Sequence, residues 1–457
     1  MPRQPLNVVI LGGSFAGLAV AHHFLDRIVH QLSTFEGAPA YRVVLVSPST
    51  HLYWNICAPR VLVSPSLISP EDAFIPIEPA FARHPFDKFT FMQGWATGVD
   101  TSAKKVTIEL VRNVKENRLS GVSKASSSTA ETNPANISTV QTISYHALVL
   151  ATGSSTYSPL YSLHGTHEDT LAELRAFHRR LETAHSVMIV GGGPSGVETA
   201  GQLATYYNQK RRWRTFKEKR HRSDTTITLL SGGARLLPKL PPTVSKKAER
   251  KLKKLGVHIV HNLREIGNTT NADGTTNCIL NNDMTITSDV LISATGVYPN
   301  TRFLPQHMLD ENGYVITDPQ TLRVYAQGVG QRVYAVGDCA NYSKNYTLDV
   351  YEAVPILMKN LQNDLLTHEY KLQTVTSMPH GEAHKTARQK IAALEDAHYH
   401  QNPTDSQLMP ITRFGGVGVI FDWRIPSFLV YLMKGRKYRL GRAEGAVGRG
   451  RDPYAVR

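Results

Sequence analysis

The stretch VMIVGGGPSG at Val187–Gly196 decides the fold, and VVILGGSFAG at Val8–Gly17 repeats its pattern. In both stretches a short apolar run leads into a glycine-rich turn. This pattern predicts a buried β-strand, a tight turn and the start of an α-helix, which together form the phosphate-binding turn of a dinucleotide-binding fold. Because the turn occurs twice, we expect two nucleotide cofactors with electrons passing between them.

The glycine spacing has a physical reason. The first glycine permits the tight turn, the second lets the backbone approach a pyrophosphate, and the third lets the helix pack on the strand. The helix N-terminus then offers unpaired N–H groups to the phosphates. Ser14 departs from the pattern, because its Cβ narrows the gap while its hydroxyl offers a donor. The candidate phosphate-binding residues are Gly12, Gly13, Ser14 and Gly17 in the first turn and Gly191, Gly193 and Gly196 in the second.

Each turn opens a longer repeat of strand, helix and strand. The first turn is followed by a predicted helix from Leu18 to about Ile28 and a strand at Tyr41–Val46, and the second by a helix from Val197 to about Gln209 and a strand at Thr226–Leu230. The two halves then close on similar strands, ALVLATG at Ala147–Gly153 and VLISATG at Val290–Gly296, which add Gly153 and Gly296 as candidate cofactor-binding residues. We therefore predict an α/β fold with two Rossmann-like dinucleotide-binding domains.

The predicted domain limits follow from these repeats. Residues 1–160 and 297–373 form the two parts of an FAD-binding domain, residues 161–296 form an NAD(P)H-binding domain, and residues 374–457 form a linker and a C-terminal α+β segment. Two segments interrupt the pattern. Ser120–Thr142 is rich in Ser, Thr and Asn and is predicted to be a surface loop. Within the linker a short polar helix is predicted at about Lys385–His398.

The chain is basic, with a net charge of +14 over 457 residues, which favours acidic partners. Lys210–Arg222 (KRRWRTFKEKRHR) is either a solvated extension of the second helix or a contact for anionic lipid or nucleic acid. We expect an anionic membrane surface as a partner before nucleic acid; the oligomeric state stays open. The three cysteines are far apart and form no CxxC pair, so a reducing compartment is expected.

The expected location is the cytoplasm, and the protein is also a candidate for peripheral attachment to a mitochondrion or another lipid surface. The N-terminal apolar run that ends at Ala21 resembles a signal peptide, but its glycines fit the phosphate-binding turn instead. Pro2 excludes N-myristoylation. No apolar run approaches the roughly 20 residues that span a bilayer.

The choice between NADH and NADPH stays open at this stage. The acidic residue that usually ends the second strand and binds the ribose is replaced by Ser47 in the first copy and by Ser231 in the second. Arg235 follows the second of these strands and is either a contact for a 2′-phosphate or a plain surface residue.

The order of these motifs, followed by VYAVGDCA at Val333–Ala340, resembles the flavoprotein reductases with two dinucleotide-binding domains. The resemblance implies FAD in the first turn and NAD(P)H in the second. It also implies that Asp338, preceded by Gly337, contacts the ribityl and pyrophosphate region of FAD.

Within this family the chain resembles the AMID and ferroptosis-suppressor-protein branch, near the type II NADH dehydrogenases. GGGPSGVE ends on Glu198, where that branch has a glutamate facing the flavin. HLYWNICAPR at His51–Arg60 resembles a segment beside the flavin, and Gly415–Tyr438 resembles the C-terminal tail, with Lys434 in its lysine-x-arginine element. The likeness covers nearly the whole chain.

These residues have alternative interpretations. Glu198 either orients the cofactors and tunes proton uptake or complements the helix dipole. Lys434 either favours reduced anionic flavin or is a solvated cation. Asn55 and Arg60 are candidate contacts to FAD, or residues of a satisfied turn. The apolar stretch Phe421–Met433 lines an acceptor tunnel, lies at a membrane surface or packs in the core.

We therefore expect an FAD-dependent NAD(P)H oxidoreductase that passes a hydride from nicotinamide to flavin and electrons to a quinone-like acceptor. One alternative is a single-cysteine NADH oxidase or peroxidase that uses Cys57, which requires an exposed and acidic thiol. The other is a basic flavoprotein that acts mainly by binding nucleic acid or membrane, with the salt sensitivity that phosphate contacts bring.

Overall fold

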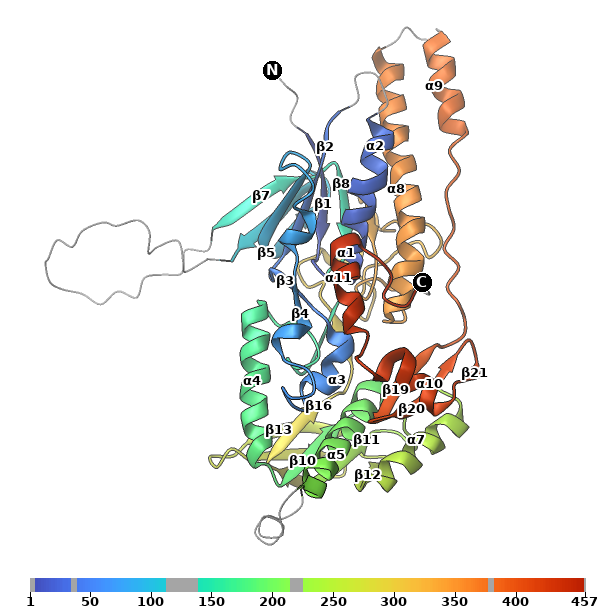
Figure 1. The fold of residues 1–457 in the computed structure, drawn as a ribbon. Coiled ribbons are helices and arrows are strands. Elements are labelled where there is room, and N and C mark those ends of the chain that lie inside the picture. Colours follow the sequence, from blue (N-terminus) through green and yellow to red (C-terminus); the bar gives the residue numbers. More distant parts are fainter. Residues whose placement is uncertain (1–4, 34–38, 112–138, 214–224, 377–381, 456–457) are drawn as a thin grey trace, which may run out of the picture.

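The computed structural model describes residues 5–33, 39–111, 139–213, 225–376 and 382–455. Two sheets with helices packed on them, one parallel and one mostly parallel, form the body of the molecule, and the C-terminal segment runs from one to the other (Figure 1). One continuous hydrophobic core contains buried side chains from both sheets, for example Val8 and Val187. The predicted α/β class is therefore confirmed.

The first sheet has seven strands in the order β18–β8–β1–β2–β5–β6–β7. Its five leading strands are parallel, and the last two pair antiparallel and extend the sheet. The strands are β1 (Leu6–Leu11), β2 (Tyr41–Ser47), β5 (Phe89–Asp100), β6 (Lys105–Leu110), β7 (Val140–Ser144), β8 (Ala147–Leu150) and β18 (Val333–Ala335).

The second sheet has the order β12–β11–β10–β16 and is parallel throughout. Its strands are β10 (Ser186–Val190), β11 (Thr226–Ser231), β12 (Val257–His261) and β16 (Val290–Ser293). Strand β10 lies between β11 and β16, just as β1 lies between β2 and β8. The sequence repeat is thus a structural repeat. Where one domain ends and the next begins stays a prediction.

The helices that follow the two turns are longer than predicted. The first consists of α1 (Phe15–His23), a π-helical turn η1 (Phe24–Ile28) and α2 (Val29–Leu32), and the second is α5 (Pro194–Trp213). Both begin about three residues before the predicted start, because the last residues of each glycine turn already belong to the helix. The basic run begins inside α5, and its remaining residues 214–222 lie outside the described residues.

The predicted surface loop at Ser120–Thr142 is wrong at its C-terminal end. Its residues up to 138 lie outside the described residues, but Val140 to Thr142 belong to β7. They pair with β6, for example Gln141 with Ile108. A polar composition is compatible with a strand here because β7 is the exposed edge of the sheet and needs no alternating apolar face.

The predicted linker helix is also displaced. Helix α9 spans Glu382–Ala392 and packs beside α8 (Thr347–Thr376), but residues 394–398 belong to no helix or strand. Asn360 of α8 forms two hydrogen bonds with the backbone of Ala397, through Nδ2 to the carbonyl (2.9 Å) and through Oδ1 from the amide (2.7 Å). The Asn360 side chain therefore binds the backbone groups of Ala397 that a longer helix would use, and the helix ends earlier than predicted.

The C-terminal segment contacts both halves of the molecule (Figure 1). Its strand β19 packs on α5, where a Cβ on Gly201 would overlap the carbonyl of Ile411. Its last helix packs on α1. The elements are β19 (Gln407–Thr412), β20 (Gly415–Ile420), β21 (Trp423–Arg424), α10 (Ser427–Val430), the π-helical turn η7 (Tyr431–Gly435), η8 (Leu440–Arg442) and α11 (Ala443–Arg449).

The remaining elements connect these parts. A two-stranded pair of β9 with β17 joins the segments that follow the two ATG strands, and β13, β14 and β15 form a small antiparallel sheet. Among the described helices, none has both the length and the apolar character needed to cross a bilayer. The bounds are β3 (His51–Tyr53), η2 (Asn55–Cys57), α3 (Ala58–Val61), η3 (Glu71–Ala73), β4 (Phe74–Pro76), η4 (Glu78–Phe81), β9 (Ser154–Thr156), α4 (His167–Thr183), α7 (Pro242–Lys254), β13 (Glu265–Thr270), β14 (Thr276–Leu280), β15 (Thr285–Ser288), β17 (Val297–Pro299) and η6 (Gln306–Met308).

Candidate functional site

The two glycine turns have the same geometry. Gly12 and Gly191 have left-handed φ values of +118° and +129°, and a Cβ on either would overlap the carbonyl of the alanine in the neighbouring ATG strand. A Cβ on Gly17 or Gly196 would overlap the carbonyl of the first glycine of its own turn. Only glycine fits these positions, so both turns retain the close helix–strand packing that the sequence pattern predicts.

The serines that replace the usual acidic residue pack beneath the turns. The Ser47 hydroxyl donates to the carbonyl of Ser49 (3.0 Å), and the Ser231 hydroxyl donates to that of Gly233 (3.2 Å). Both side chains are buried. Their hydroxyls therefore close the local turn, and neither supplies the carboxylate that selects NADH.

A cavity of about 1290 Å³ opens from the first turn. This volume exceeds the roughly 300–1,000 Å³ of typical small-molecule pockets, so it has room for a dinucleotide and part of a second ligand. The predicted site residues that line it are Gly12, Gly13, Ser14, Asn55, Gly153, Glu198, Gly337, Asp338 and Lys434. Residues Pro194 and Ser195 of the second turn also line it, so both turns border one cavity.

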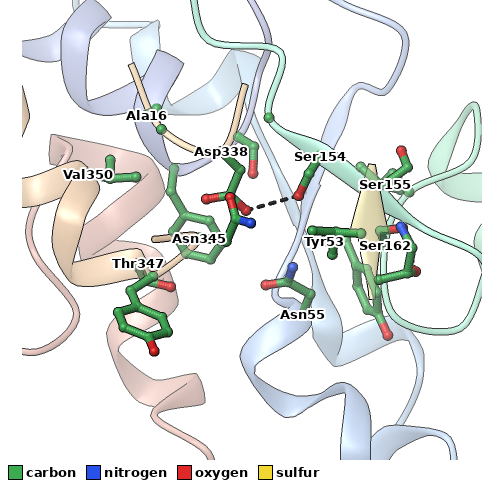
Figure 2. Close-up of a pocket in the computed structure, with 18 of the residues that line it drawn as sticks. Ala16, Tyr53, Asn55, Ser154, Ser155, Ser162, Asp338, Asn345, Thr347 and Val350 are labelled. Atoms are coloured by element: carbon green, nitrogen blue, oxygen red, sulfur yellow. Dashed lines mark hydrogen bonds between the residues drawn. The ribbon is translucent and has the colours of Figure 1, made fainter. Parts of the chain in front are cut away.

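Asp338 lies three residues after the end of β18 and directly after Gly337, which has φ +79°. Its Oδ2 accepts a hydrogen bond from Ser154 Oγ at 3.0 Å (Figure 2). Burial raises the pKa of the Asp338 carboxyl to about 6. A carboxylate desolvated in this way is stabilised by further hydrogen-bond donors, and the hydroxyl groups of a ribityl chain are such donors.

Polar groups on both sides of the cavity face the space near Asp338. Figure 2 shows Asn345 and Thr347 on the side of Asp338, and Asn55 on the opposite side. Asn345 has a left-handed φ of +62°, and its buried Oδ1 has no hydrogen-bond partner among the described residues. An orphaned buried acceptor indicates a missing donor, so these residues fit a hydrogen-bonding ligand such as FAD.

The N-terminus of helix α8 also meets this cavity. Thr347, Leu348 and Val350, in the first two turns of the helix, line it. Because the N-terminus of a long helix carries partial positive charge, this wall stabilises negative charge on a bound group. Sequence analysis missed both Asn345 and this helix end, because a turn asparagine ahead of a helix carries no specific signal.

Glu198 and Lys434 form a buried ion pair at the cavity wall. Lys434 Nζ lies 2.6 Å from Glu198 Oε1 and also donates to the Leu408 carbonyl at 3.0 Å. The side chains are only 3% exposed for Glu198 and 14% for Lys434. Burial raises the pKa of Glu198, and the neighbouring ammonium partly offsets this. The other carboxylate oxygen, Oε2, is buried and forms no hydrogen bond of normal length among the described residues, although the buried Tyr438 hydroxyl also helps to lower the pKa of Glu198.

This pair corrects one interpretation of Glu198. The first turn of α5 contains no acidic residue, since Glu198 is the fifth residue of a helix that begins at Pro194. It therefore does not complement the helix dipole; Lys434 is its partner. Lys434 is likewise not a solvated cation.

One predicted FAD contact, Arg60, lies away from the cavity lining. Arg60 is absent from the cavity lining and instead donates through Nε to Gln202 Oε1 (3.0 Å) and through Nη1 to the Arg436 carbonyl (3.2 Å). Its guanidinium lies 4.5 Å from the centre of the Tyr438 ring. The Arg60 side chain thus joins α3, α5 and the C-terminal segment, and its contact to FAD stays a prediction.

The predicted nicotinamide contacts lie around the second turn. Arg235 is in the loop after β11, where Nη2 donates to the Pro238 carbonyl at 2.6 Å. Sequence analysis missed Arg264, which reaches the same loop with Nε 3.4 Å from the Gly232 carbonyl. Gly17, Gly191, Gly193, Gly196 and Gly296 do not line the large cavity. Gly17 packs beneath the first turn, and Gly296 has a left-handed φ of +129°.

Cys57 contradicts the peroxidase alternative. Its side chain is fully buried, and Sγ donates to the Trp54 carbonyl at 3.0 Å. Burial raises the pKa of the thiol to about 12. A thiol that is neutral and inaccessible does not attack peroxide. Cys278 and Cys339 are buried as well.

His146, His368 and Glu369 place ligand atoms within 4.8 Å of one another. Burial and the neighbouring Arg332 lower the pKa of His146, to about 3. The same positive surroundings oppose a divalent cation, so we assign no metal to this cluster.

Comparisons with known proteins agree with the two-turn fold. The sequence profile of the family described as pyridine nucleotide-disulphide oxidoreductase matches residues 6–357. The chain is 33% identical to oxidoreductase phnG of Penicillium herquei over 447 residues, which is 96% of this chain and 95% of the relative. The structure is similar to NDH2 of Plasmodium falciparum (TM-score 0.59, 13% identity, 93% and 92% covered). It is also similar to the water-forming NADH oxidase of Lactobacillus brevis bound to NADH (TM-score 0.56, 16% identity, 78% and 69% covered).

Proposed function

Since this chain belongs to the pyridine nucleotide-disulphide oxidoreductase family, we propose that it reduces a quinone-like acceptor. It is an NAD(P)H-dependent flavoprotein with FAD as its second cofactor. Bound FAD supplies the redox chemistry, taking a hydride from the nicotinamide and passing two electrons on. Within the family we place the chain near the AMID and ferroptosis-suppressor-protein branch, on the sequence features given above.

The described cysteines argue against a disulphide acceptor. Cys57, Cys278 and Cys339 are all buried and free, and none lines the large cavity. Electrons therefore have no enzyme dithiol to pass through and must leave the cavity directly. A planar acceptor that takes two electrons and two protons, such as a quinone, suits this arrangement.

The observation that carries the proposal is the Glu198–Lys434 pair. Reduction of a quinone consumes protons, and Glu198 at the cavity wall has a raised pKa and an Oε2 that forms no hydrogen bond of normal length, with the Tyr438 hydroxyl as a neighbour. Lys434 holds the carboxylate through Oε1 and leaves Oε2 to hold or release a proton. In this proposal Glu198 is the proton-handling group, Lys434 orients it, and the Asp338 and Asn345 side chains hold FAD.

The proposed location and the second candidate function rest on the sequence. The cytoplasm, with peripheral attachment to a lipid surface, remains the proposed location. A role mainly in binding membrane or nucleic acid remains the second candidate, favoured only by the net charge of +14. Salt-sensitive retention on DNA or on anionic vesicles with no NAD(P)H turnover would favour it.

The test is steady-state oxidation of NADH and NADPH with quinones, oxygen and peroxide as acceptors, in the parent and in Glu198→Gln. We expect quinones to support the fastest turnover. Loss of general acid catalysis typically costs 10²–10⁴-fold, so we expect the variant to lose at least about tenfold in quinone turnover. Flavin reduction by NAD(P)H, followed in single-turnover mixing, should change much less.

Glu249→Gln is the matched control, because it removes another glutamate that is ion-paired with a lysine (Lys253, 2.7 Å) on α7, outside the cavity. Its turnover should equal that of the parent. Quinone rates no higher than those with oxygen would overturn the acceptor. An unchanged Glu198→Gln rate would remove the role of Glu198.

A further inference from the structure

A second cavity, of about 550 Å³, lies in the C-terminal segment. Five of its eight lining residues are cationic and none is acidic. The cations are Lys434, Arg436, Lys437, Arg439 and Arg442. They fall within nine residues of the sequence, over η7 and the turn that follows it. The protein's own carboxylates offset part of this charge, since Glu198 pairs with Lys434 and Asp452 acts on Arg439 and Arg442. The remaining positive charge favours an anion.

The cations differ in how far the protein itself satisfies them. Lys434 is paired with Glu198, and Arg439 donates through Nη1 to the Pro453 carbonyl at 2.7 Å. Arg439 Nε, however, is buried without a hydrogen-bond partner among the described residues. Arg436, Lys437 and Arg442 take part in none of the ion pairs found in the described part of the chain.

We propose that this second cavity binds a phosphate-bearing anion. Guanidinium groups match phosphate oxygens in geometry and charge, and three of the five cations are arginines. The buried Nε of Arg439 is the donor that such an oxygen would satisfy. The volume suits a phosphate group with a substituent rather than a bare ion.

The phosphate has two chemical sources, a lipid headgroup or a soluble phosphate ester. Leu432 lines this cavity and is 57% exposed, and Phe428, one helical turn before it, is 60% exposed. Exposed apolar side chains beside a basic cavity are compatible with a headgroup whose acyl chains lie next to them. The shared chemistry is the phosphate group, and the experiment separates the sources.

Lys434 and Arg439 line both cavities, so a bound phosphate adds negative charge beside the Glu198–Lys434 pair. The binding site itself does not depend on which acceptor the enzyme uses. If the quinone proposal fails, the phosphate-binding proposal still holds, and if the phosphate-binding proposal fails, the quinone proposal is unaffected.

The test uses the FAD-loaded protein in chloride buffer with two probes. Inorganic pyrophosphate is titrated by calorimetry, and vesicles of phosphatidylcholine alone or mixed with phosphatidylglycerol are used in co-sedimentation. The variant is Arg436→Glu with Lys437→Glu, both exposed positions. The matched control, Lys246→Glu with Lys247→Glu on the surface of α7, makes the same charge change elsewhere.

We expect the cavity variant to bind at least one probe about tenfold or more weakly, and the control to bind within about threefold of the parent. Loss of pyrophosphate binding indicates a soluble ester, and loss confined to phosphatidylglycerol vesicles indicates a headgroup. Pyrophosphate also reaches the glycine turns, so only the difference between the two variants counts.

Equal binding by the two variants, or no binding of either probe by the parent, would overturn the proposal. Flavin content and the thermal midpoint verify that both variants are folded. Should the glutamate variant misfold, Arg436→Gln with Lys437→Gln tests the same contacts without introducing negative charge.

Discussion

At the scale of single residues, the buried polar groups that lack hydrogen-bond partners within the protein indicate where a ligand binds. Asp338 lines the cavity with one hydrogen bond from Ser154 and a pKa raised to about 6, and the Asn345 acceptor has no partner among the described residues. Cys57 is equally buried but has its hydrogen bond within its own turn. Residues with unmet hydrogen-bonding capacity at the cavity are therefore the ones assigned to the cofactor.

Replacing Asp338 with Ala should release FAD. A hydrogen bond to a charged group contributes about 1.5–3 kcal/mol, so we expect FAD affinity to fall about tenfold to a hundredfold. The measurement is flavin retained per chain after gel filtration, followed by titration with FAD. Asp273→Ala, in the exposed turn between β13 and β14, is the control. Equal FAD affinity in the parent and the Asp338 variant would contradict the assignment.

At the scale of elements, the two strand–turn–helix units show which glycines are needed for packing and which leave space for a bound pyrophosphate. A Cβ on Gly196 would overlap the carbonyl of Gly191, because the helix start crosses directly over the turn. A Cβ on Gly193 would meet nothing within 4 Å. The first position serves packing within the protein, while the open space at the second is where a pyrophosphate would approach.

Alanine substitutions should separate these two roles. Gly196→Ala should lower the free energy of unfolding by about 1–3 kcal/mol, because backbone must move to admit the methyl group. Gly193→Ala should leave the thermal midpoint and the FAD content unchanged but raise the KM for NAD(P)H. The two variants serve as controls for each other, measured by thermal unfolding and steady-state kinetics. An unchanged KM in Gly193→Ala would mean that the nicotinamide cofactor does not approach this turn.

At the scale of the whole molecule, the C-terminal segment joins the two halves. Strand β19 packs on α5, and α11 packs on α1. His22 of α1 contributes to the second contact, because its Nε2 lies 2.6 Å from the Val447 carbonyl and its Nδ1 lies 3.1 Å from Arg83 Nη2. Nε2 therefore donates and Nδ1 accepts, which requires a neutral imidazole.

Acidification should weaken this contact. Burial lowers the pKa of His22 to about 4, against 6.5 in the unfolded chain. The unfolded state therefore takes up the proton first, so His22 lowers the stability of the fold progressively as the pH falls from 6.5 towards 4. The loss reaches about 2 kcal/mol by about pH 5.

Thermal unfolding between about pH 7 and pH 5 is the measurement. In His22→Gln the side-chain amide can still donate to Val447 but does not titrate, so the decline should be shallower than in the parent. His307→Gln, an exposed position, is the control and should follow the parent. Equal slopes in all three proteins would show that His22 does not control this acid sensitivity.

Much of the fold is predictable from sequence because its determinants are local. The apolar runs, the obligatory glycines at 12, 17, 191 and 196, and the ATG strands each constrain their own backbone, and the structure places them as the repeat predicts. The linker helix was misplaced because Asn360, on another helix, binds the backbone of Ala397. The C-terminal end of the predicted surface loop is instead a strand, because pairing with β6 stabilises a strand there despite the polar composition.

The sequence by itself determined two dinucleotide-binding units and a carboxylate after the last parallel strand, because strand, turn and helix signals act over about ten to thirty residues. The tertiary structure alone decided that Glu198 pairs with Lys434, 236 residues away, and that Arg60 of α3 binds Gln202 of α5. These outcomes depend on how distant segments pack and lose contact with water, and no local pattern of residues contains that information.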